Sequence, residues 1–451
     1  MKITQKDAIK QTGHLVDIWM PLKIKYDCNP GISIGITHKG KLLYAKGFGF
    51  ADLKKKVKTD DKTLYRIASH SKMFTAVSVL QLVEAGKLHL DDKAADYIPW
   101  FKAKTAKSDA KYITIRQLLS HTAGIFRDGD TPQWETGKFP KDLKKSFSPK
   151  SLVIENLTDF KYTNYGYSLL GPVIEKASGM RYADYVGANI LKPLGMKDTY
   201  VDYQPGILHI ATGYGAVIPD VKREIFGQYV TNAYTPATGF ISNLADMTKF
   251  MAAISPNTGS SRILHKESRK EMSRPHGKTG DNDEYGLGLD IDYSDGSKTI
   301  GHGGGFNGFL TRTILDMKTD IGVMVYANSL EVNPSAIAFG ILDSIRKILN
   351  QSGQAIKAVP FKRYEGAYRD KWGDEIVVRA GQTLAGFSAK NDKPLRWARR
   401  FMPSKTKDTF VIKSDNKYGS YDEEAVFKDI RKGKANTLLI SGSSARRARQ
   451  S

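Results

Sequence analysis

Cysteine and long hydrophobic runs are the scarcest features of this sequence. Cys28 is the only cysteine among 451 residues, so no internal disulfide stabilises the fold. The longest strongly apolar stretch, residues 321–327, has the length of a strand and is too short to cross a bilayer. Charged residues interrupt residues 1–22, which leaves no hydrophobic region typical of a secretory signal peptide. We therefore expect no transmembrane segment. The sequence as it stands predicts a cytoplasmic protein, or a periplasmic or secreted one if its signal peptide is missing from this sequence.

Metal-binding and nucleotide-binding patterns are also lacking. The nine histidines do not form a His-Glu-x-x-His motif. Asp290, Asp292 and Asp295 have the spacing of calcium ligands, but the twelfth loop position is Gly301 rather than the glutamate of an EF-hand. Residues 303–308 match Gly-x-Gly-x-x-Gly, yet a predicted strand follows where a dinucleotide site requires a helix. The sequence predicts no metal and no other cofactor.

Positive charge, in contrast, is abundant. The chain has 69 Lys and Arg against 47 Asp and Glu, which gives a formal net charge of +22. The basic clusters are short and far apart, without the interleaved aromatic residues of a nucleic-acid-binding surface. They are Lys54–Lys56, Lys144–Lys145, Arg399–Arg400 and Arg446–Arg447. This distribution predicts a hydrated basic surface that can associate with an anionic surface, and no nucleic-acid partner.

The predicted elements of the first 350 residues favour an α+β fold. A helix is predicted over 3–19 and a strand hairpin over 32–37 and 41–48, and helical patterns dominate from about 90 to 255. Strands then return, and a helix follows them. These later elements cover 286–293, 298–302, 308–316, 321–328 and 335–350. We expect one antiparallel sheet assembled from both ends of this region, flanked by helices and with the helical part inserted as a lobe.

The tail of the chain is predicted to be a separate small domain. A segment at 351–360 that contains Ser, Gly and Pro is predicted to be a linker between residues 1–350 and 361–451. The tail contains only short strand patterns. They are 364–368, 375–379, 409–412 and 437–440. This organisation predicts a small C-terminal all-β domain.

Ser69 and Lys72 form the first candidate chemical site. They stand at the start of a strongly helical segment, residues 71–85. Residues three apart share a helix face, so Lys72 can reach the Ser69 hydroxyl, which needs a proton acceptor to act as a nucleophile. The helix start also offers backbone donors to a developing oxyanion. The apolar run after Lys72 predicts its burial and a depressed pKa. In isolation the same spacing is typical of an ordinary surface helix start.

A second candidate segment, residues 160–167, is rich in tyrosine and precedes a helix predicted from Tyr167 to Ser178. The hydroxyl of Tyr162 is suited to sharing the proton of the nucleophile, and the amide of Asn164 is suited to holding a substrate amide. A tyrosine-rich turn before a helix is otherwise a common structural element.

A third segment, residues 300–308, ends a predicted strand with His302 and several glycines. Because glycine has no side chain, a substrate can lie against the backbone at Gly304 and Gly305, and the amide of Gly305 is a candidate oxyanion donor. His302 is suited to orienting a substrate carboxylate or to relaying a proton. A glycine-rich hairpin loop with an incidental histidine is the alternative interpretation.

Together the three segments resemble the active-site motifs of the serine β-lactamase and penicillin-binding protein family. The likeness is greatest to its class C β-lactamase, DD-peptidase and esterase branch. In order, the motifs read Ser69-x-x-Lys72, Tyr162-x-Asn164 and His302-x-Gly304. Further stretches that agree are 47–52, 115–124, 193–196 and 236–242. The resemblance covers about residues 25 to 345 and identifies residues 1–350 as a β-lactamase-like catalytic domain.

The resemblance implies a lobe of helices beside an antiparallel sheet, with the catalytic serine at their junction. It implies that Ser69 is the acylated nucleophile and that Lys72 and Tyr162 transfer protons. Asn164 is then a substrate ligand. His302 stands where many β-lactamases carry lysine, which suits peptidases and esterases of the family better than β-lactam hydrolysis.

The expected function is that of a serine hydrolase acting through an acyl-enzyme on a small-molecule or peptide substrate. A peptidase of the D-amino-acid or DD-peptidase type and an esterase are preferred, with a β-lactamase as the alternative. A catalytically silent binding protein for an anionic polymer is the alternative of another class. The tail, through residues 364–369 and 372–373, also resembles the small β-barrel domains that follow the catalytic unit in some peptidases of the family.

Overall fold

The structure, a computed structural model, describes most of the chain as two compact units. The described residues are 3–106, 108–155, 159–293, 296–351, 360–414 and 419–448. Asp295 and the predicted linker at 351–360, apart from its two end residues, lie outside them. The smaller unit comprises Met1–Ile32, Phe48–Phe50 and Glu331–Ser451, and the larger comprises Ser33–Gly47 and Ala51–Leu330.

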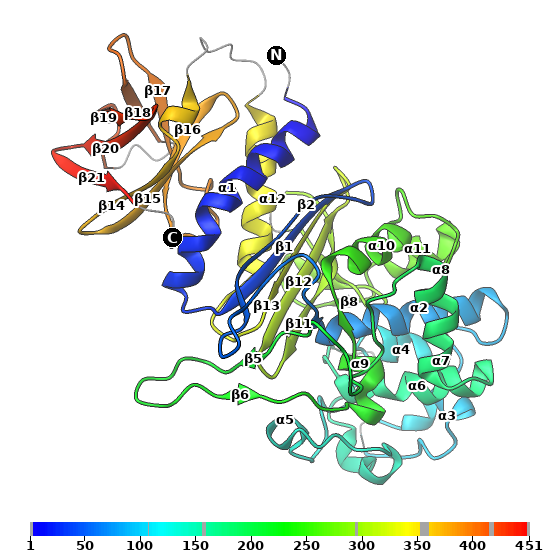
Figure 1. The fold of residues 1–451 in the computed structure, drawn as a ribbon. Coiled ribbons are helices and arrows are strands. Elements are labelled where there is room, and N and C mark those ends of the chain that lie inside the picture. The colour runs from blue at the N-terminus through cyan, green and yellow to red at the C-terminus, as the bar shows by residue number, and fades with distance from the viewer. Residues whose placement is uncertain are drawn as a thin grey trace. The chain divides into compact units, whose positions relative to one another are not determined.

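An antiparallel sheet lies mostly in the larger unit (Figure 1). In the described part of the chain it has nine strands, in the order β3-β2-β1-β13-β12-β11-β10-β9-β8. The strands are β1 (Gly31–His38), β2 (Lys41–Asp52), β3 (Val57–Lys58), β8 (Gly277–Lys278), β9 (Asp283–Tyr285), β10 (Asp290–Asp292), β11 (Thr299–Phe306), β12 (Phe309–Asp316) and β13 (Ile321–Ala327). Strands that precede and follow the helices in sequence share this sheet, which confirms the predicted α+β fold.

Two strands differ from the prediction near the candidate site. The predicted strand 298–302 continues to Phe306 in β11, which pairs with β12 over its whole length. The glycines of the third motif therefore lie within a strand and not in a hairpin loop. The predicted strand 286–293 is shorter, because Gly288 adopts a φ of +75° and turns the chain before β10 begins.

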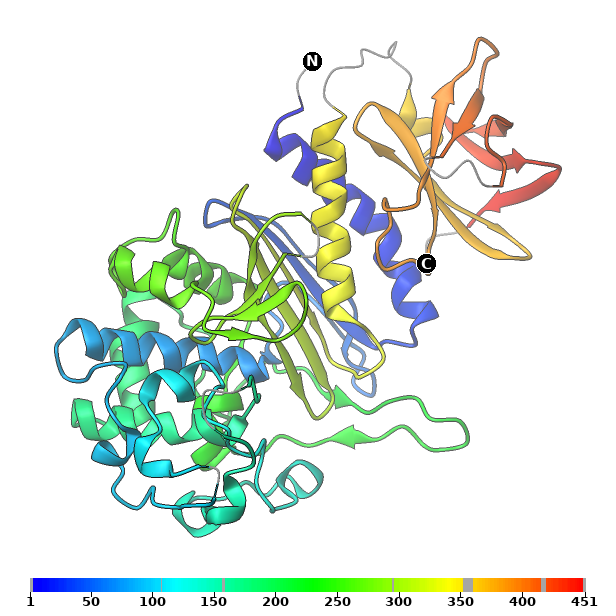
Figure 2. The same ribbon diagram turned by 180° about the vertical axis from the view of Figure 1, so that it is seen from behind.

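Helices of the larger unit gather beside the sheet strands in both views (Figures 1 and 2). They are α2 (Ser71–Glu84), α3 (Ala94–Tyr97), α4 (Ile115–Leu119), α5 (Gln133–Thr136), α6 (Asn164–Ser178), α7 (Tyr182–Val186), α8 (Lys192–Leu194), α9 (Thr235–Thr238), α10 (Leu244–Ile254) and α11 (Lys266–Met272). These helices confirm the predicted helical lobe. Helix α6 begins three residues earlier than predicted, because the Thr163 hydroxyl caps it by accepting from the Gly166 amide at 2.8 Å.

Shorter elements complete the larger unit. Two strand pairs are separate from the main sheet: β4 (Tyr65–Arg66) with β7 (Ile241–Ser242), and β5 (Gly213–Tyr214) with β6 (Ile225–Phe226). Single turns of 3₁₀ helix are η1 (Ala68–His70), η2 (Ala110–Tyr112), η3 (Lys144–Ser146), η4 (Pro149–Ser151) and η6 (Asn232–Tyr234), and η5 (Gly187–Leu191) is a π-helical turn. The η1 turn leads directly into α2 and carries Ser69.

Helix α2 is buried on all sides over its first ten residues. Its Phe74 ring stacks against Phe240 and Phe250, with ring centroids 4.5 and 3.9 Å apart. Aromatic pairs in this geometry contribute beyond the apolar area that they bury. This packing fixes the helix that begins next to Ser69.

Phe74→Ala is expected to lower the free energy of unfolding by about 3–5 kcal/mol, because it leaves a cavity in this stack. Urea denaturation followed by circular dichroism measures the loss. The matched control is Leu208→Ala at a side chain that is 73% exposed, which should change stability by no more than about 0.5 kcal/mol. Equal effects for both variants would contradict the assigned core.

Two long helices belong to the smaller unit, α1 (Gln5–Tyr26) and α12 (Pro334–Asn350), which lie side by side (Figure 2). The predicted closing helix 335–350 is confirmed. Helix α1 continues past the predicted end at residue 19, because its last turns pack on the tail domain: the Tyr26 hydroxyl donates to Asp374 Oδ2 at 2.9 Å. Lys23 pairs with Asp27 at 2.7 Å and with Asp392 at 2.8 Å. The sequence pattern of the helix itself does not reveal the partners in the tail domain, because they lie far away in the chain.

The tail forms a closed β-barrel in the described residues, of eight strands in sequence order from β14 to β21. The strands are β14 (Gly366–Asp370), β15 (Gly373–Ala380), β16 (Thr383–Ser388), β17 (Arg399–Pro403), β18 (Thr409–Lys413), β19 (Glu424–Arg431), β20 (Lys434–Ile440) and β21 (Ser443–Arg447), and a 3₁₀ turn, η7 (Phe361–Arg363), precedes them. The barrel confirms the predicted all-β tail, and the four predicted strands correspond to β14, β15, β18 and β20. Within the described ranges, no helix of the protein is both long enough and apolar enough to cross a membrane.

Candidate active site

Ser69 lies in the η1 turn between β4 and α2. Ala68, the residue before it, adopts a φ of +48°, a conformation that costs energy for any residue with a side chain. The turn is held from outside by the amide of Ile67, which donates to the Phe240 carbonyl at 3.0 Å, and by Ser71 Oγ, which accepts from the Phe240 amide at 3.1 Å. The half-buried serine is therefore presented on a fixed, strained backbone.

Lys72 is fully buried and its Nζ lies 3.1 Å from Ser69 Oγ. The same atom lies 2.7 Å from Asn164 Oδ1 and 2.9 Å from the Ala237 carbonyl oxygen. Burial lowers the pKa of Lys72 well below its usual value, as the sequence predicted. A neutral amine has two N–H donors, which the two carbonyl oxygens occupy, so its lone pair is left to accept the Ser69 proton.

Tyr162 is the second group next to the serine. Its hydroxyl hydrogen-bonds to Ser69, and its ring centroid lies 4.8 Å from Lys72 Nζ. Burial raises the pKa of Tyr162 above its usual value, and the Ser69 hydrogen bond opposes this only in part. The phenol therefore stays protonated, and it can donate or relay a proton but does not act as a phenolate base.

Asn164 links Lys72 to an acidic residue that the sequence did not single out. Its Nδ2 donates to Asp128 Oδ1 at 2.7 Å, while its Oδ1 accepts from Lys72. Asp128 also pairs with Arg127, with 3.1 Å between Nε and Oδ2. Both ends of the Asn164 side chain are thus engaged within the protein, and the residue positions the lysine amine. No motif marks Asp128, because it lies in the loop between α4 and α5.

His302 lies on β11, with its Nε2 2.9 Å from the Tyr285 hydroxyl and its Nδ1 2.5 Å from the Gly303 carbonyl oxygen. Burial is the main cause that lowers the pKa of His302, so the ring is neutral near neutral pH. A carbonyl oxygen can only accept, so Nδ1 carries the proton and Nε2 accepts from Tyr285. The ring centroids of His302 and Tyr162 are 6.4 Å apart. This histidine is a neutral polar group in the same site and does not supply a positive charge.

A partly buried ion pair lies beside His302. Arg312 Nη1 is 2.6 Å from Asp290 Oδ2, and the Gly303 amide donates to the same oxygen at 3.2 Å. Burial raises the pKa of Asp290, but the charge of Arg312 and the hydrogen bonds from Arg312 and the Gly303 amide oppose this, and the net shift is downward. Asp290 is therefore an ionised partner of Arg312.

Over the described residues, no group of three or more His, Cys, Asp or Glu is arranged to hold a metal ion.

The glycines of β11 differ in how closely they are packed. A Cβ at Gly304 would lie 2.4 Å from the Ile67 carbonyl oxygen and 2.3 Å from Thr311 Oγ1. Gly305 is exposed, and a Cβ there would meet only Leu310, at 3.7 Å. Gly304 is thus the position where the strand touches the turn that carries Ser69, and Gly305 is the accessible one.

Gly304→Ala is expected to push β11 away from the η1 turn, to destabilise the fold by about 1–3 kcal/mol and to displace Ser69. Turnover of a reporter ester should fall at least about tenfold, since small displacements of reacting groups are costly. Thermal melts should separate this variant from Gly305→Ala, which has room for its methyl group and should melt with the wild type. A Gly304→Ala protein with unchanged stability and turnover would contradict this packing.

Two buried histidines near the serine had no role in the sequence prediction. His70 contacts the Ile67 carbonyl oxygen at 2.8 Å and Thr313 Oγ1 at 3.0 Å, and burial lowers its pKa to about 3. The ring centroid of His121 lies 4.2 Å from that of Tyr162, and its Nδ1 accepts from the Thr163 amide at 3.1 Å. Both are neutral groups that support the site. Their signal in the sequence was position alone: one follows the serine, and the other lies in the stretch 115–124.

The family is established by comparison with known proteins. Residues 26–340 match the family model described as Beta-lactamase. The chain therefore belongs to the β-lactamase and penicillin-binding protein family of serine hydrolases. All the site residues described above lie within the matched range, as the resemblance of the three motifs implied.

Individual relatives agree with this assignment. Protein flp of Staphylococcus aureus (strain MW2) is 30% identical over 306 residues, which cover 66% of this chain and 59% of that protein, so this chain matches about three fifths of its length. Penicillin-binding protein 4* of Bacillus subtilis (strain 168) is 27% identical over 384 residues, which cover 79% of this chain and 82% of the relative. The structure of an octameric penicillin-binding protein homologue from Pyrococcus abyssi superposes with a TM-score of 0.64 at 25% identity and covers 97% of this chain and 99% of its own. The similarity to the Pyrococcus abyssi structure therefore extends over the C-terminal barrel.

Proposed function

We propose that the protein is a serine hydrolase that forms an acyl-enzyme at Ser69. The observation that carries this proposal is the 3.1 Å contact between Ser69 Oγ and the buried Nζ of Lys72, whose depressed pKa favours the neutral amine. An activated serine requires a proton acceptor of this kind within hydrogen-bond reach. Membership of the serine hydrolase family supports the same chemistry.

The proposed reaction has two steps. In the first, Ser69 Oγ attacks the carbonyl carbon while its proton passes to Lys72 Nζ, and the leaving group departs with a proton relayed through the Tyr162 hydroxyl. In the second, water attacks the ester and its proton returns along the same groups to Ser69. The amide of Gly305 and that of Ser69 at the helix start are the candidate donors to the oxyanion. Asn164 holds Lys72 in place, and it contacts substrate only if the amide turns away from Asp128.

The preferred substrate is a peptide or D-amino-acid amide, followed by a carboxylic ester and then by a β-lactam. Charge supports this order. Among the described side chains around Ser69, His302 and Lys72 favour their neutral forms, and the two arginines, Arg127 and Arg312, are paired with Asp128 and Asp290. A D-amino-acid amide or an ester, whose leaving group carries no carboxylate, therefore suits the site better than a penicillin or a peptide cleaved before its C-terminal residue, since each of these carries one there.

Turnover of four reporters tests this proposal: a p-nitrophenyl ester, D-alanine p-nitroanilide, a D-alanyl-D-alanine peptide and nitrocefin. The amide or the ester should be turned over fastest and nitrocefin slowest, and Ser69→Ala should abolish every activity. Turnover that persists in Ser69→Ala would reject the nucleophile. Absence of turnover for all four reporters would favour the non-catalytic binding protein, and fastest turnover of nitrocefin would reverse the substrate order.

A further inference from the structure

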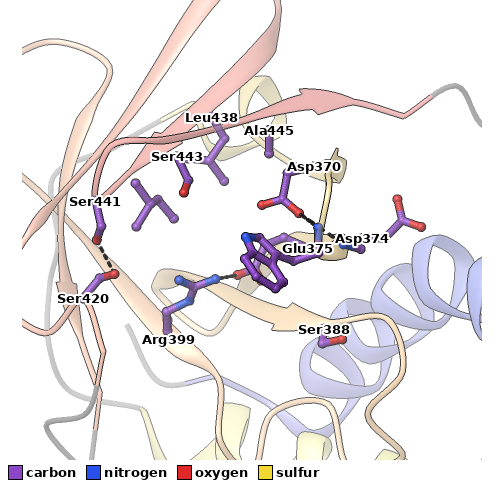
Figure 3. Close-up of a pocket in the computed structure, with 13 residues that line it drawn as sticks. Asp370, Asp374, Glu375, Ser388, Arg399, Ser420, Leu438, Ser441, Ser443 and Ala445 are labelled. Carbon is purple, nitrogen blue, oxygen red and sulfur yellow. Dashed lines mark hydrogen bonds and ion pairs between the residues drawn. The ribbon is translucent and has the colours of Figure 1, made fainter.

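The mouth of the C-terminal barrel contains a cavity of about 330 Å³ (Figure 3). It opens at the end of the barrel where the β14–β15 and β20–β21 turns meet the end of β16 and the start of β17. Its volume is at the lower end of the range of about 300–1,000 Å³ typical of small-molecule sites. Leu438 and Ala445 line the cavity and also belong to the aromatic core of the barrel. The cavity is therefore closed below by that core.

An ion pair lies in this cavity. Glu375 Oε1 is 2.7 Å from Arg399 Nη2, and the two side chains are 17% and 33% exposed (Figure 3). Room for the carboxyl is made by Gly386, where a Cβ would lie 2.4 Å from Glu375 Oε1. Burial raises the pKa of Glu375, and Arg399 opposes the shift. Replacing a partly buried ion pair by apolar residues is often neutral or stabilising, so stability alone does not account for this pair inside a barrel.

Hydroxyl groups and an exposed indole complete the lining. Ser388, Ser420, Ser441 and Ser443 lie around the cavity, and Ser420 and Ser441 hydrogen-bond to each other (Figure 3). Trp372 also lines the cavity, although its side chain is 77% exposed. Its turn is fixed by Asp370 Oδ1, which accepts from the amides of Trp372 at 2.7 Å and of Gly373 at 3.1 Å. The backbone that carries the indole is thus fixed at the rim of the cavity. Lys371 Nζ lies 5.2 Å from the ring centroid over one face, and the indole is otherwise mostly exposed, which leaves the other face for a ligand.

We propose that this cavity binds a neutral carbohydrate, with one sugar ring stacked on Trp372 and its hydroxyls bonded to the Glu375–Arg399 pair. A pyranose has an apolar C–H face that complements an indole face, and a rim of hydroxyls that both donate and accept. The carboxylate accepts and the guanidinium donates, so adjacent hydroxyls satisfy both groups at once. A fatty ligand would desolvate the ion pair without replacing its hydrogen bonds, and a small ion would have to break it. This proposal is independent of the reaction at Ser69.

Isothermal titration of the full-length protein with chitotriose, cellobiose and maltotriose tests the proposal. At least one of these saccharides should bind, and Trp372→Ala should weaken its affinity at least tenfold. Glu375→Gln should weaken it about tenfold as well, because a charge-assisted hydrogen bond is lost. The matched control is Trp397→Ala, since this second barrel tryptophan is 68% exposed and does not line the cavity. It should keep wild-type affinity, and so should Ser69→Ala.

Three results would overturn the proposal. The first is that none of the three saccharides binds. The second is that Trp397→Ala weakens binding as much as Trp372→Ala does. The third is that laurate or D-alanine binds in their place and is lost in Trp372→Ala, which would assign the cavity to an apolar or a zwitterionic ligand. Thermal melts of each variant confirm that the barrel is folded.

Discussion

Lys72→Ala is expected to lower kcat/KM by about 10³–10⁴-fold, the upper part of the range associated with loss of a positioned general base. The Lys72 amine lies 3.1 Å from Ser69 Oγ and is the proposed acceptor of its proton. Its other two contacts are carbonyl oxygens that hold it in this orientation. Alanine leaves the hydroxyl without an acceptor for its proton. Steady-state turnover of the best reporter substrate measures the effect.

The pH dependence of the wild type follows from the same group. Only the neutral amine accepts a proton, so kcat/KM should fall as the pH decreases through the pKa of Lys72, which burial places well below its usual value. A plot of log kcat/KM against pH should have a slope of about one below this pKa, because one proton is involved. The residual activity of Lys72→Ala should not show this fall. Lys72→Arg should not rescue activity, because a guanidinium stays protonated. If the alanine variant kept a tenth of the activity or more, Lys72 would not be the base.

Tyr162→Phe is expected to lower kcat/KM by about 10²–10³-fold, because it removes the hydroxyl that hydrogen-bonds to Ser69 and that we propose as the proton relay to the leaving group. The acid limb of the pH profile should remain, since Lys72 sets it. The loss should be smaller for an ester with a good leaving group, such as p-nitrophenolate, which departs without a proton. Comparing an anilide with a p-nitrophenyl ester measures this difference.

The matched control is Tyr165→Phe. Tyr165 is also buried, stands three residues away and donates its hydroxyl to the Leu143 carbonyl at 2.6 Å. Losing that hydrogen bond should cost about 1 kcal/mol of stability and should leave kcat/KM close to the wild-type value. Equal loss of activity in both variants would indicate a structural role for Tyr162.

The sequence predicted the elements whose periodicity is local. The hairpin that became β1 and β2, helix α2 and helix α12 were all placed within a few residues, because each is marked by an apolar pattern within its own segment of the sequence. Four barrel strands were missed, among them β17, which begins Arg399-Arg400. In a small barrel only the inward face of a strand is apolar, so a short strand with arginines does not stand out. The end of α1 was missed because its partners lie in the barrel.

The candidate site was predictable to the extent that its residues fall in short motifs. Ser69, Lys72, Tyr162, Asn164 and His302 were all named from the sequence, and the fold brings them together. Their charge states were predicted only for the lysine, where the apolar run after it indicated burial. The remaining groups, Asp128, Tyr285, Asp290 and Arg312, come from loops and strands far apart in sequence. The pairing of Asp290 with Arg312 depends on the register of β10, β11 and β12, which the sequence does not reveal.

Intact-mass measurement after incubation with a fluorophosphonate or a labelled penicillin tests the central claim most directly. We expect one covalent adduct on the wild-type protein, mapped by peptide digestion to Ser69, and none on Ser69→Ala. Lys72→Ala should form the same adduct much more slowly. Absence of an adduct on the wild type, or an adduct that persists in Ser69→Ala, would contradict the assignment of Ser69 as the nucleophile.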